Sequence, residues 1–81
     1  MKKIEVYTKG NCTYCTAVKY WLAERNFEFE EHSLNEEITR TKFKQTYPEL
    51  TTVPQVFITN ESDERVLIGG FTDVIKHSVF K

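Results

Sequence analysis

The chain has 81 residues, of which 40% are hydrophobic and 28% charged, and its formal net charge at pH 7 is -1. These values indicate one folded domain over residues 1–81 and exclude a disordered chain. They also exclude a basic, phosphate-tracking nucleic-acid surface, and no apolar run approaches the roughly 20 residues that span a bilayer. The first residues resemble a strand rather than a signal peptide. We therefore expect neither nucleic acid nor membrane as a partner, and a cytoplasmic location.

The first part of the chain predicts a strand, a helix and a second strand. Residues 3–7 are rich in β-favouring side chains, and a Gly-Asn pair follows them. Over residues 14–25 apolar side chains recur four positions apart, which predicts a helix with one apolar face. Residues 27–30 alternate apolar and charged side chains, the pattern of a half-buried strand.

The second part predicts a helix, a hairpin and a last helix. Asn35 and the two glutamates after it supply a cap and an acidic first turn for a helix over residues 35–48. Residues 56–59 and 65–68 flank a polar turn and predict a hairpin of two buried strands. Thr72 and Asp73 begin the last helix. The order βαβ then ββα predicts an α/β domain with a four-stranded mixed sheet flanked by three helices.

Both cysteines of the chain, Cys12 and Cys15, lie three positions apart where the first strand gives way to the first helix. A structural disulfide stabilises mainly by closing a loop, and a loop of two intervening residues constrains almost nothing. Zinc would need two more ligands, but His32 and His77, which we expect at the surface, are 45 residues apart. A C-x-x-C pair near a βαβ pattern is typical of a redox site, which we favour over both alternatives.

Position within the helix assigns different roles to the two thiols. The helix dipole, Lys9 and neighbouring donors are expected to lower the pKa of the Cys12 thiol from its ordinary value of about 8.5. Cys15 follows one turn later and is expected to be more buried. Cys12 is therefore the predicted nucleophile and Cys15 the predicted resolving thiol.

Three segments of the chain resemble the signature segments of the glutaredoxin family, in order and in separation. They are Thr-Lys-Gly-Asn-Cys-Thr-Tyr-Cys at residues 8–15, Thr-Val-Pro-Gln-Val-Phe-Ile at 52–58 and Gly-Gly-Phe-Thr-Asp at 69–73. The resemblance extends over essentially the whole chain, and the chain is similar to small bacterial and phage-encoded members. If the protein is phage-encoded, the expected location is the host cytoplasm. It implies a thioredoxin-like fold and a monomeric enzyme that reduces protein disulfides and glutathione mixed disulfides, with glutathione as co-substrate. Ribonucleotide reductase, a substrate of the family, is a candidate protein partner.

The resemblance also implies where glutathione binds. The backbone of Thr52 and Val53, held by a cis peptide before Pro54, would meet its peptide part. The last helix would take the γ-glutamyl end, Lys9 and Arg40 the glycyl carboxylate, and Tyr14 would stack over the site. The full expected set is Lys9, Tyr14, Arg40, Thr52, Val53, Pro54, Gly70, Phe71, Thr72 and Asp73. Simpler roles remain open: a solvated helix face for Arg40, partial burial for Tyr14, and a helix start with Thr72 as the cap and Asp73 as its first-turn acid. For Thr72 and Asp73 this role is compatible with glutathione binding.

Two positions depart from the family pattern. Thr13 stands where many dithiol members have proline, and Phe71 replaces a common tyrosine or cysteine. Because members without this proline sometimes carry iron–sulfur clusters, a dimer sharing a [2Fe–2S] cluster through Cys12 and two glutathiones is the alternative function. No other metal is expected.

Overall fold

The structure is a computed structural model that describes residues 3–80. Its four strands form one mixed sheet in the order β2-β1-β3-β4. Strand β1 is parallel to β2 and antiparallel to β3, and β3 pairs with β4 in an antiparallel hairpin. The predicted parallel pair and hairpin are therefore confirmed. The strands are β1 (Lys3–Thr8), β2 (Glu30–Ser33), β3 (Gln55–Thr59) and β4 (Arg65–Gly69).

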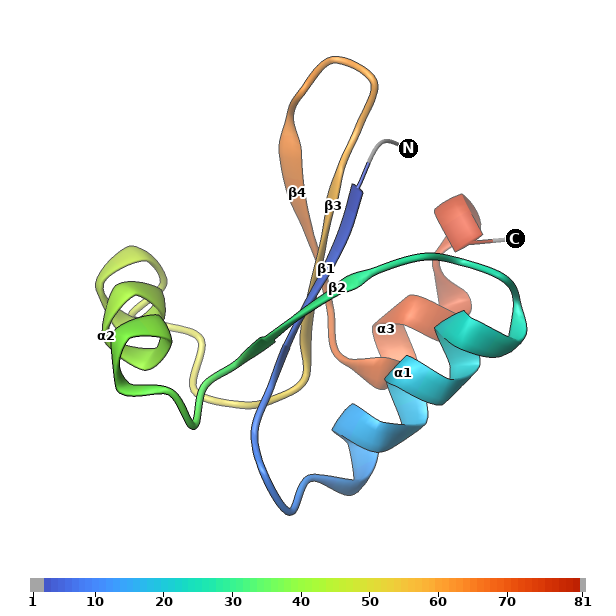
Figure 1. Ribbon diagram of the computed structural model, residues 1–81. Helices are drawn as coiled ribbons and strands as arrows, with labels where there is room; N and C mark the ends of the chain where they lie inside the picture. The colour runs from blue at the N-terminus through green and yellow to red at the C-terminus, as the bar shows by residue number, and fades with distance from the viewer. Residues whose placement is uncertain (1–2, 81) are drawn as a thin grey trace.

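Helices cover both faces of this sheet. Helices α1 and α3 lie together on one side of it, and α2 lies on the other (Figure 1). The bounds are α1 (Thr13–Glu24), α2 (Glu37–Thr46) and α3 (Phe71–Lys76), followed by a short 3-10 turn, η1 (Ser78–Phe80). Within residues 3–80, no helix has the length and apolar composition needed to cross a membrane.

The sheet divides the core into two clusters. Between the sheet and helices α1 and α3 lies the larger one, in which Val6, Val18, Leu22, Val56 and Val74 are completely buried. The smaller one, under α2, is built from Leu34, Phe43 and Phe57. Spacings of three and four along α1 bring Cys15, Val18 and Leu22 to one buried face, as the predicted periodicity requires.

The second strand lies three residues later than predicted. β2 begins at Glu30, and the alternation over residues 27–30 has another cause. Phe27 and Phe29 are half-buried against the larger core cluster. The backbone N–H of Phe27 donates to the Leu22 carbonyl at 3.0 Å, so the start of this segment is hydrogen-bonded to the last turn of α1 and not to a neighbouring strand. The apolar side chains here cover the core edge before the ladder with β1 starts.

Three further sequence predictions need correction. The N-cap of α2 is Glu36 rather than Asn35, whose side chain instead accepts a hydrogen bond from the Gly10 N–H at 3.4 Å. The N-cap of α3 is Gly70 rather than Thr72. β4, expected to be buried, lies at the edge of the sheet, and its side chains are exposed or half-buried. Val66 and Ile68 pack against the larger core cluster without being fully buried.

Candidate active site

Cys12 occupies the N-cap of α1, and its sulfur is the capping atom. The Cys15 backbone N–H donates to Cys12 Sγ at 3.1 Å. The two sulfurs form a disulfide, with their Cα atoms 5.2 Å apart. Cys12 is half-buried, whereas Cys15 is only 2% exposed. A sulfur that already accepts a backbone N–H at the positive end of a helix is stabilised as a thiolate once the pair is reduced. The geometry therefore fits Cys12 as nucleophile and Cys15 as resolving thiol.

The loop before β3 approaches the same sulfur. The Val53 carbonyl oxygen lies 3.8 Å from Cys12 Sγ, and the Val53–Pro54 peptide bond is cis, as predicted. Gln55 is buried, and its side-chain amide donates to the Thr52 carbonyl at 3.0 Å and to the Thr52 hydroxyl at 3.3 Å. These bonds hold the loop in place beside the cysteine pair.

On one side of this loop lies a cavity of about 170 Å³ that contains eight of the expected binding residues. Across it, the Tyr14 and Phe71 rings stack with their centroids 6.2 Å apart. Tyr14 remains 62% exposed, so simple partial burial does not describe it, and its stacking on Phe71 at the cavity fits the expected position. The lining consists of Tyr14, Thr52, Val53, Pro54, Gly70, Phe71, Thr72 and Asp73.

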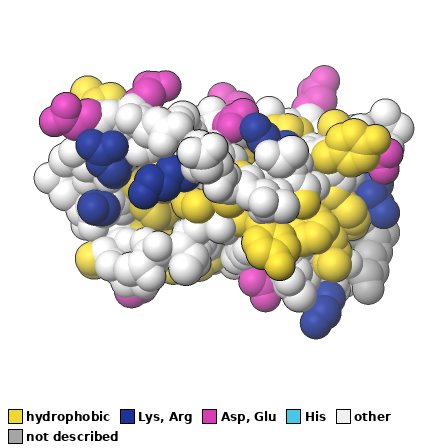
Figure 2. Space-filling model, turned by 90° about the horizontal axis from the view of Figure 1, so that it is seen from below, with side chains coloured by type: hydrophobic (Ala, Val, Ile, Leu, Met, Phe, Trp, Pro, Cys, Tyr) yellow, Lys and Arg dark blue, Asp and Glu magenta, His cyan; other side chains and the backbone are white. Residues whose placement is uncertain are grey.

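On the other side lies a larger cleft of about 510 Å³, which contains the two remaining residues, Lys9 and Arg40. Thr52 and Val53 line both cavities. Arg40 also donates to the Leu34 carbonyl at 3.3 Å, so it is not simply a solvated side chain. Figure 2 views the molecule from below and shows Lys and Arg side chains gathered on the side where α2 lies, next to a hydrophobic surface.

Asp73 has a structural role that the sequence analysis left open. Its Oδ2 accepts the Gly70 N–H at 3.0 Å and so caps the start of α3. Gly69, which precedes Gly70, has a φ of +120°, a backbone conformation that residues with a Cβ rarely adopt. A Cβ at this position would also collide with the Asp73 carboxylate. The tight turn brings β4 directly onto α3 and sets Asp73 at the cavity edge.

Gly69→Ala should therefore destabilise the protein by roughly 1–3 kcal/mol, since it combines a strained backbone with loss of the Asp73 cap. The matched control is Gly70→Ala, where a Cβ would come no closer than 3.5 Å to another atom. Denaturant unfolding measures both variants. Equal stability losses in the two would contradict this account of the turn.

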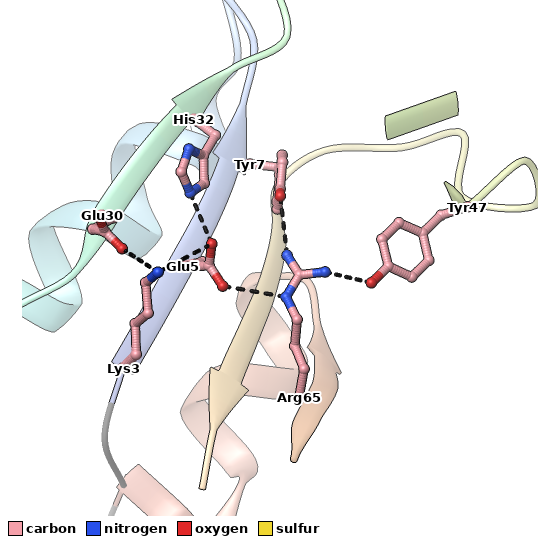
Figure 3. Close-up of polar contacts among 7 residues, drawn as sticks. All are labelled: Lys3, Glu5, Tyr7, Glu30, His32, Tyr47 and Arg65. Atoms are coloured by element: carbon pink, nitrogen blue, oxygen red, sulfur yellow. Dashed lines mark hydrogen bonds and ion pairs between the residues drawn. The ribbon is translucent and has the colours of Figure 1, made fainter. Parts of the chain in front are cut away.

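A polar network on the α2 side of the sheet was missed by the sequence analysis (Figure 3). Its centre is Arg65, whose guanidinium lies 4.1 Å above the Phe57 ring. Nε contacts Glu5 at 3.2 Å, one terminal nitrogen donates to the Tyr7 hydroxyl at 3.0 Å, and the other donates to the Tyr47 hydroxyl. Because Tyr47 is the C-cap residue of α2, these contacts connect the end of that helix to three strands.

The same network extends along β1 and β2. His32, expected as a surface residue, is half-buried with Nε2 3.0 Å from Glu5. Glu5, Glu30 and His32 offer ligand atoms within 4.8 Å of one another, a spacing that could suit a metal. Lys3, however, already places its ammonium 2.9 Å from Glu30 and 4.0 Å from Glu5. We therefore read the group as an internally neutralised ion-pair network.

Burial alone would raise the pKa of the Glu5 carboxyl, but the His32 hydrogen bond and the Arg65 charge outweigh it and lower this pKa from its ordinary value. Glu5 then contributes stability above its unfolded-state pKa, and this contribution is lost as pH falls through the lower folded-state pKa. Glu5→Gln should lower the free energy of unfolding at pH 7 by about 1–3 kcal/mol, with the difference narrowing in acid.

Unfolding measured from pH 7 down to acid pH tests this expectation. Glu30→Gln is the matched control, because its pair with Lys3 is exposed and such pairs contribute only about 0–1 kcal/mol. A Glu5→Gln deficit that stays constant with pH would show that packing, not charge, is responsible.

Comparison with known proteins agrees with this geometry. Residues 4–62 match the family model described as Glutaredoxin. Glutaredoxin 3 from Escherichia coli strain K12 is 31% identical over 74 residues, which cover 91% of this chain and 83% of that protein. The crystal structure of glutaredoxin 1 from Francisella tularensis, complexed with cacodylate, gives a TM-score of 0.70 at 35% identity and covers 90% of this chain and 87% of that one. The buckwheat glutaredoxin–glutathione complex gives 0.72 at 25% identity, covering 90% and 64%.

The structural similarity to the Francisella tularensis protein extends over 90% of this chain, which includes the sheet and the cysteine pair described above. The fold is thioredoxin-like, as the sequence resemblance implied. The chain therefore belongs to the glutaredoxin family and is a thiol–disulfide oxidoreductase that works through Cys12 and Cys15.

Proposed function

We propose that the protein is a glutathione-dependent oxidoreductase that reduces protein disulfides and glutathione mixed disulfides, as a monomer in the cytoplasm. One observation carries this proposal. The Cys12–Cys15 pair lies beside a loop whose residues Thr52 and Val53 line two cavities, and those cavities together contain every residue expected to bind glutathione. Support also comes from the buckwheat relative, which was solved as a complex with glutathione.

In the proposed binding mode, glutathione lies across the loop in an extended form. Its cysteinyl backbone meets the Val53 backbone, which brings its sulfur to Cys12. Its glycyl carboxylate enters the cationic cleft near Lys9 and Arg40, and its γ-glutamyl ammonium meets Asp73. Charged groups at both ends then fix the orientation of a small, flexible ligand whose central atom reacts.

The reaction is a pair of thiolate displacements. Cys12 thiolate attacks the glutathione sulfur of a mixed disulfide, the target leaves as a thiol after taking up a proton, and Cys12 becomes glutathionylated. A second glutathione thiolate attacks this adduct, which releases glutathione disulfide and restores Cys12. With a protein disulfide, Cys15 instead attacks the mixed disulfide at Cys12, so two electrons pass to the substrate and the pair is oxidised. The burial of Cys15 and its position one turn from Cys12 support this second attack.

The direct test is turnover of a glutathione mixed disulfide with glutathione, glutathione reductase and NADPH. We expect NADPH consumption that saturates with substrate and depends on the protein. Lack of turnover with glutathione, combined with reduction of the pair by thioredoxin reductase, would overturn the proposal. Reduction of oxidised ribonucleotide reductase in the same coupled system would test that enzyme as a protein partner.

The alternative function, a [2Fe–2S] carrier, is favoured by one feature of the site. Cys12 is half-buried at the start of α1, and Thr13 follows it where many dithiol members of the family have proline. A dimer could then share a cluster through Cys12 and glutathione from each partner. Brown colour with visible absorbance after anaerobic purification, together with a dimeric elution volume, would support this alternative. A colourless monomer would contradict the cluster-carrier alternative and leave the reductase as the proposed function.

A further inference from the structure

The cleft beside α2 is larger than a single glycyl group requires. Its volume of about 510 Å³ falls within the range of about 300–1,000 Å³ typical of sites for whole small ligands. Its apolar floor includes Leu34, Phe43 and Leu50, which belong to or pack against the smaller core cluster. The cleft can therefore accept more of a bound chain than the end of glutathione.

The cleft also carries more positive charge than the single glycyl carboxylate of glutathione would neutralise. Lys9 comes from the loop after β1, and Arg40 and Lys44 come from α2. Among the described residues that line the cleft there is no aspartate or glutamate. The glycyl end of glutathione brings one negative charge to three cations. A cleft lined by charges of one sign attracts ligands of the opposite sign.

The direction in which a substrate peptide would lie follows from the positions of the smaller cavity, near Asp73, and the cleft, near Lys9. In the proposed binding mode the γ-glutamyl end of glutathione lies near Asp73, its cysteine near Val53 and its glycine near Lys9. A substrate cysteine placed at Cys12 in the same way sends the residues that follow it into the cationic cleft.

We propose that this cleft binds an acidic segment of disulfide-bonded substrate proteins, on the C-terminal side of the cysteine that Cys12 attacks. The proposal rests on the proposed function for the direction of the chain. Lys44 is the specificity-determining residue, because it adds a cation beyond Lys9 and Arg40, the pair assigned to the glycyl carboxylate. The preference concerns which protein disulfides are reduced and leaves the chemistry of exchange unchanged.

The test uses disulfide-linked dimers of short peptides with one cysteine each. One peptide carries two aspartates after the cysteine, a second carries them before it, and a third carries two lysines after it. Pre-reduced protein is mixed with each dimer in single turnover without glutathione. Each event converts one peptide disulfide to two peptide thiols and the Cys12–Cys15 dithiol to its disulfide, so electrons and protons balance.

We expect aspartates after the cysteine to react about fivefold faster than lysines there, equivalent to about 1 kcal/mol at 1.4 kcal/mol per factor of ten. Aspartates before the cysteine should give a smaller advantage, and added salt should reduce the preference. Lys44→Glu should abolish or reverse the ratio of the two rates. If Lys44→Glu folds poorly, Lys44→Gln serves as the second variant, and it should reduce the ratio.

Lys42→Glu is the matched control. It makes the same charge change two residues away on α2, but Lys42 lines other cavities and not this cleft. Retention of the wild-type ratio in this variant supports docking in the cleft. Equal loss in Lys42→Glu and Lys44→Glu, or a wild-type ratio near one, would overturn the proposal.

The charge preference of the cleft and the glutathione-dependent function can be contradicted separately. Because the single-turnover assay contains no glutathione, it reads the charge preference even if the coupled glutathione assay shows no turnover. Equal rates for aspartates before and after the cysteine would overturn the direction, and with it this inference, while leaving glutathione turnover as measured.

Discussion

Cys12→Ser should reduce both disulfide reduction and removal of glutathione to the uncatalysed background. A serine hydroxyl is barely ionised near neutral pH, so the helix N-terminus and the Cys15 N–H cannot convert it into a useful nucleophile. The loss should occur without unfolding. Serine is among the preferred N-cap residues, so it keeps an acceptor for the Cys15 N–H at the start of α1.

Activity and stability must therefore be measured on the same sample. The coupled glutathione assay and a protein-disulfide assay report activity, and thermal unfolding under reducing conditions reports the fold. Substantial activity in Cys12→Ser would exclude Cys12 as the nucleophile. Inactivity accompanied by unfolding would instead mean that the sulfur is needed as a cap.

Cys15→Ser should separate the two activities. Removal of glutathione from mixed disulfides needs only Cys12 and glutathione from solution, so it should persist. Reduction of protein disulfides should fall at least about a hundredfold, because resolution within the protein has a high effective concentration that free glutathione lacks. The mixed disulfide between Cys12 and the target should then accumulate.

Mass spectrometry under non-reducing conditions would detect that trapped complex. Cys15 is almost completely buried, and an unpaired serine hydroxyl there would cost about 1–3 kcal/mol, so Cys15→Ala provides a second variant without that penalty. If both Cys15 variants lose both activities while Cys12→Ser keeps either one, the two roles are reversed.

Local sequence features correctly predicted much of the fold and the central chemistry. Apolar spacing identified α1, and the C-x-x-C pair at its start identified the reactive centre, because helix periodicity and capping depend on nearby residues. The same reasoning misplaced β2. Phe27 and Phe29 alternate with charged residues, yet they pack on the core edge, since burial and strand pairing leave the same pattern in a short segment.

The binding residues could be named from sequence only through the resemblance to a family. Nothing local in residues 52–54 and 69–73 indicates that they line one cavity, because their proximity depends on the pairing of β3 with β4 and the turn into α3. The sequence allowed Asp73 both a role at the helix start and a role in binding, but only the structure shows that it accepts the Gly70 N–H at the N-cap of α3.

Sequence by itself determined the chemistry of this protein: a cysteine pair at a helix start between a strand and an apolar helix face. Tertiary structure alone decided what supports and surrounds that pair. Arg65 meets Glu5 from 60 residues away, and it meets Tyr7 and Tyr47 because three strands and the end of α2 converge there. Lys9 and Lys44 share a cleft for the same reason. Ion pairs and clefts depend on the register of strands and the packing of helices, and these are set by the whole core rather than by neighbouring residues.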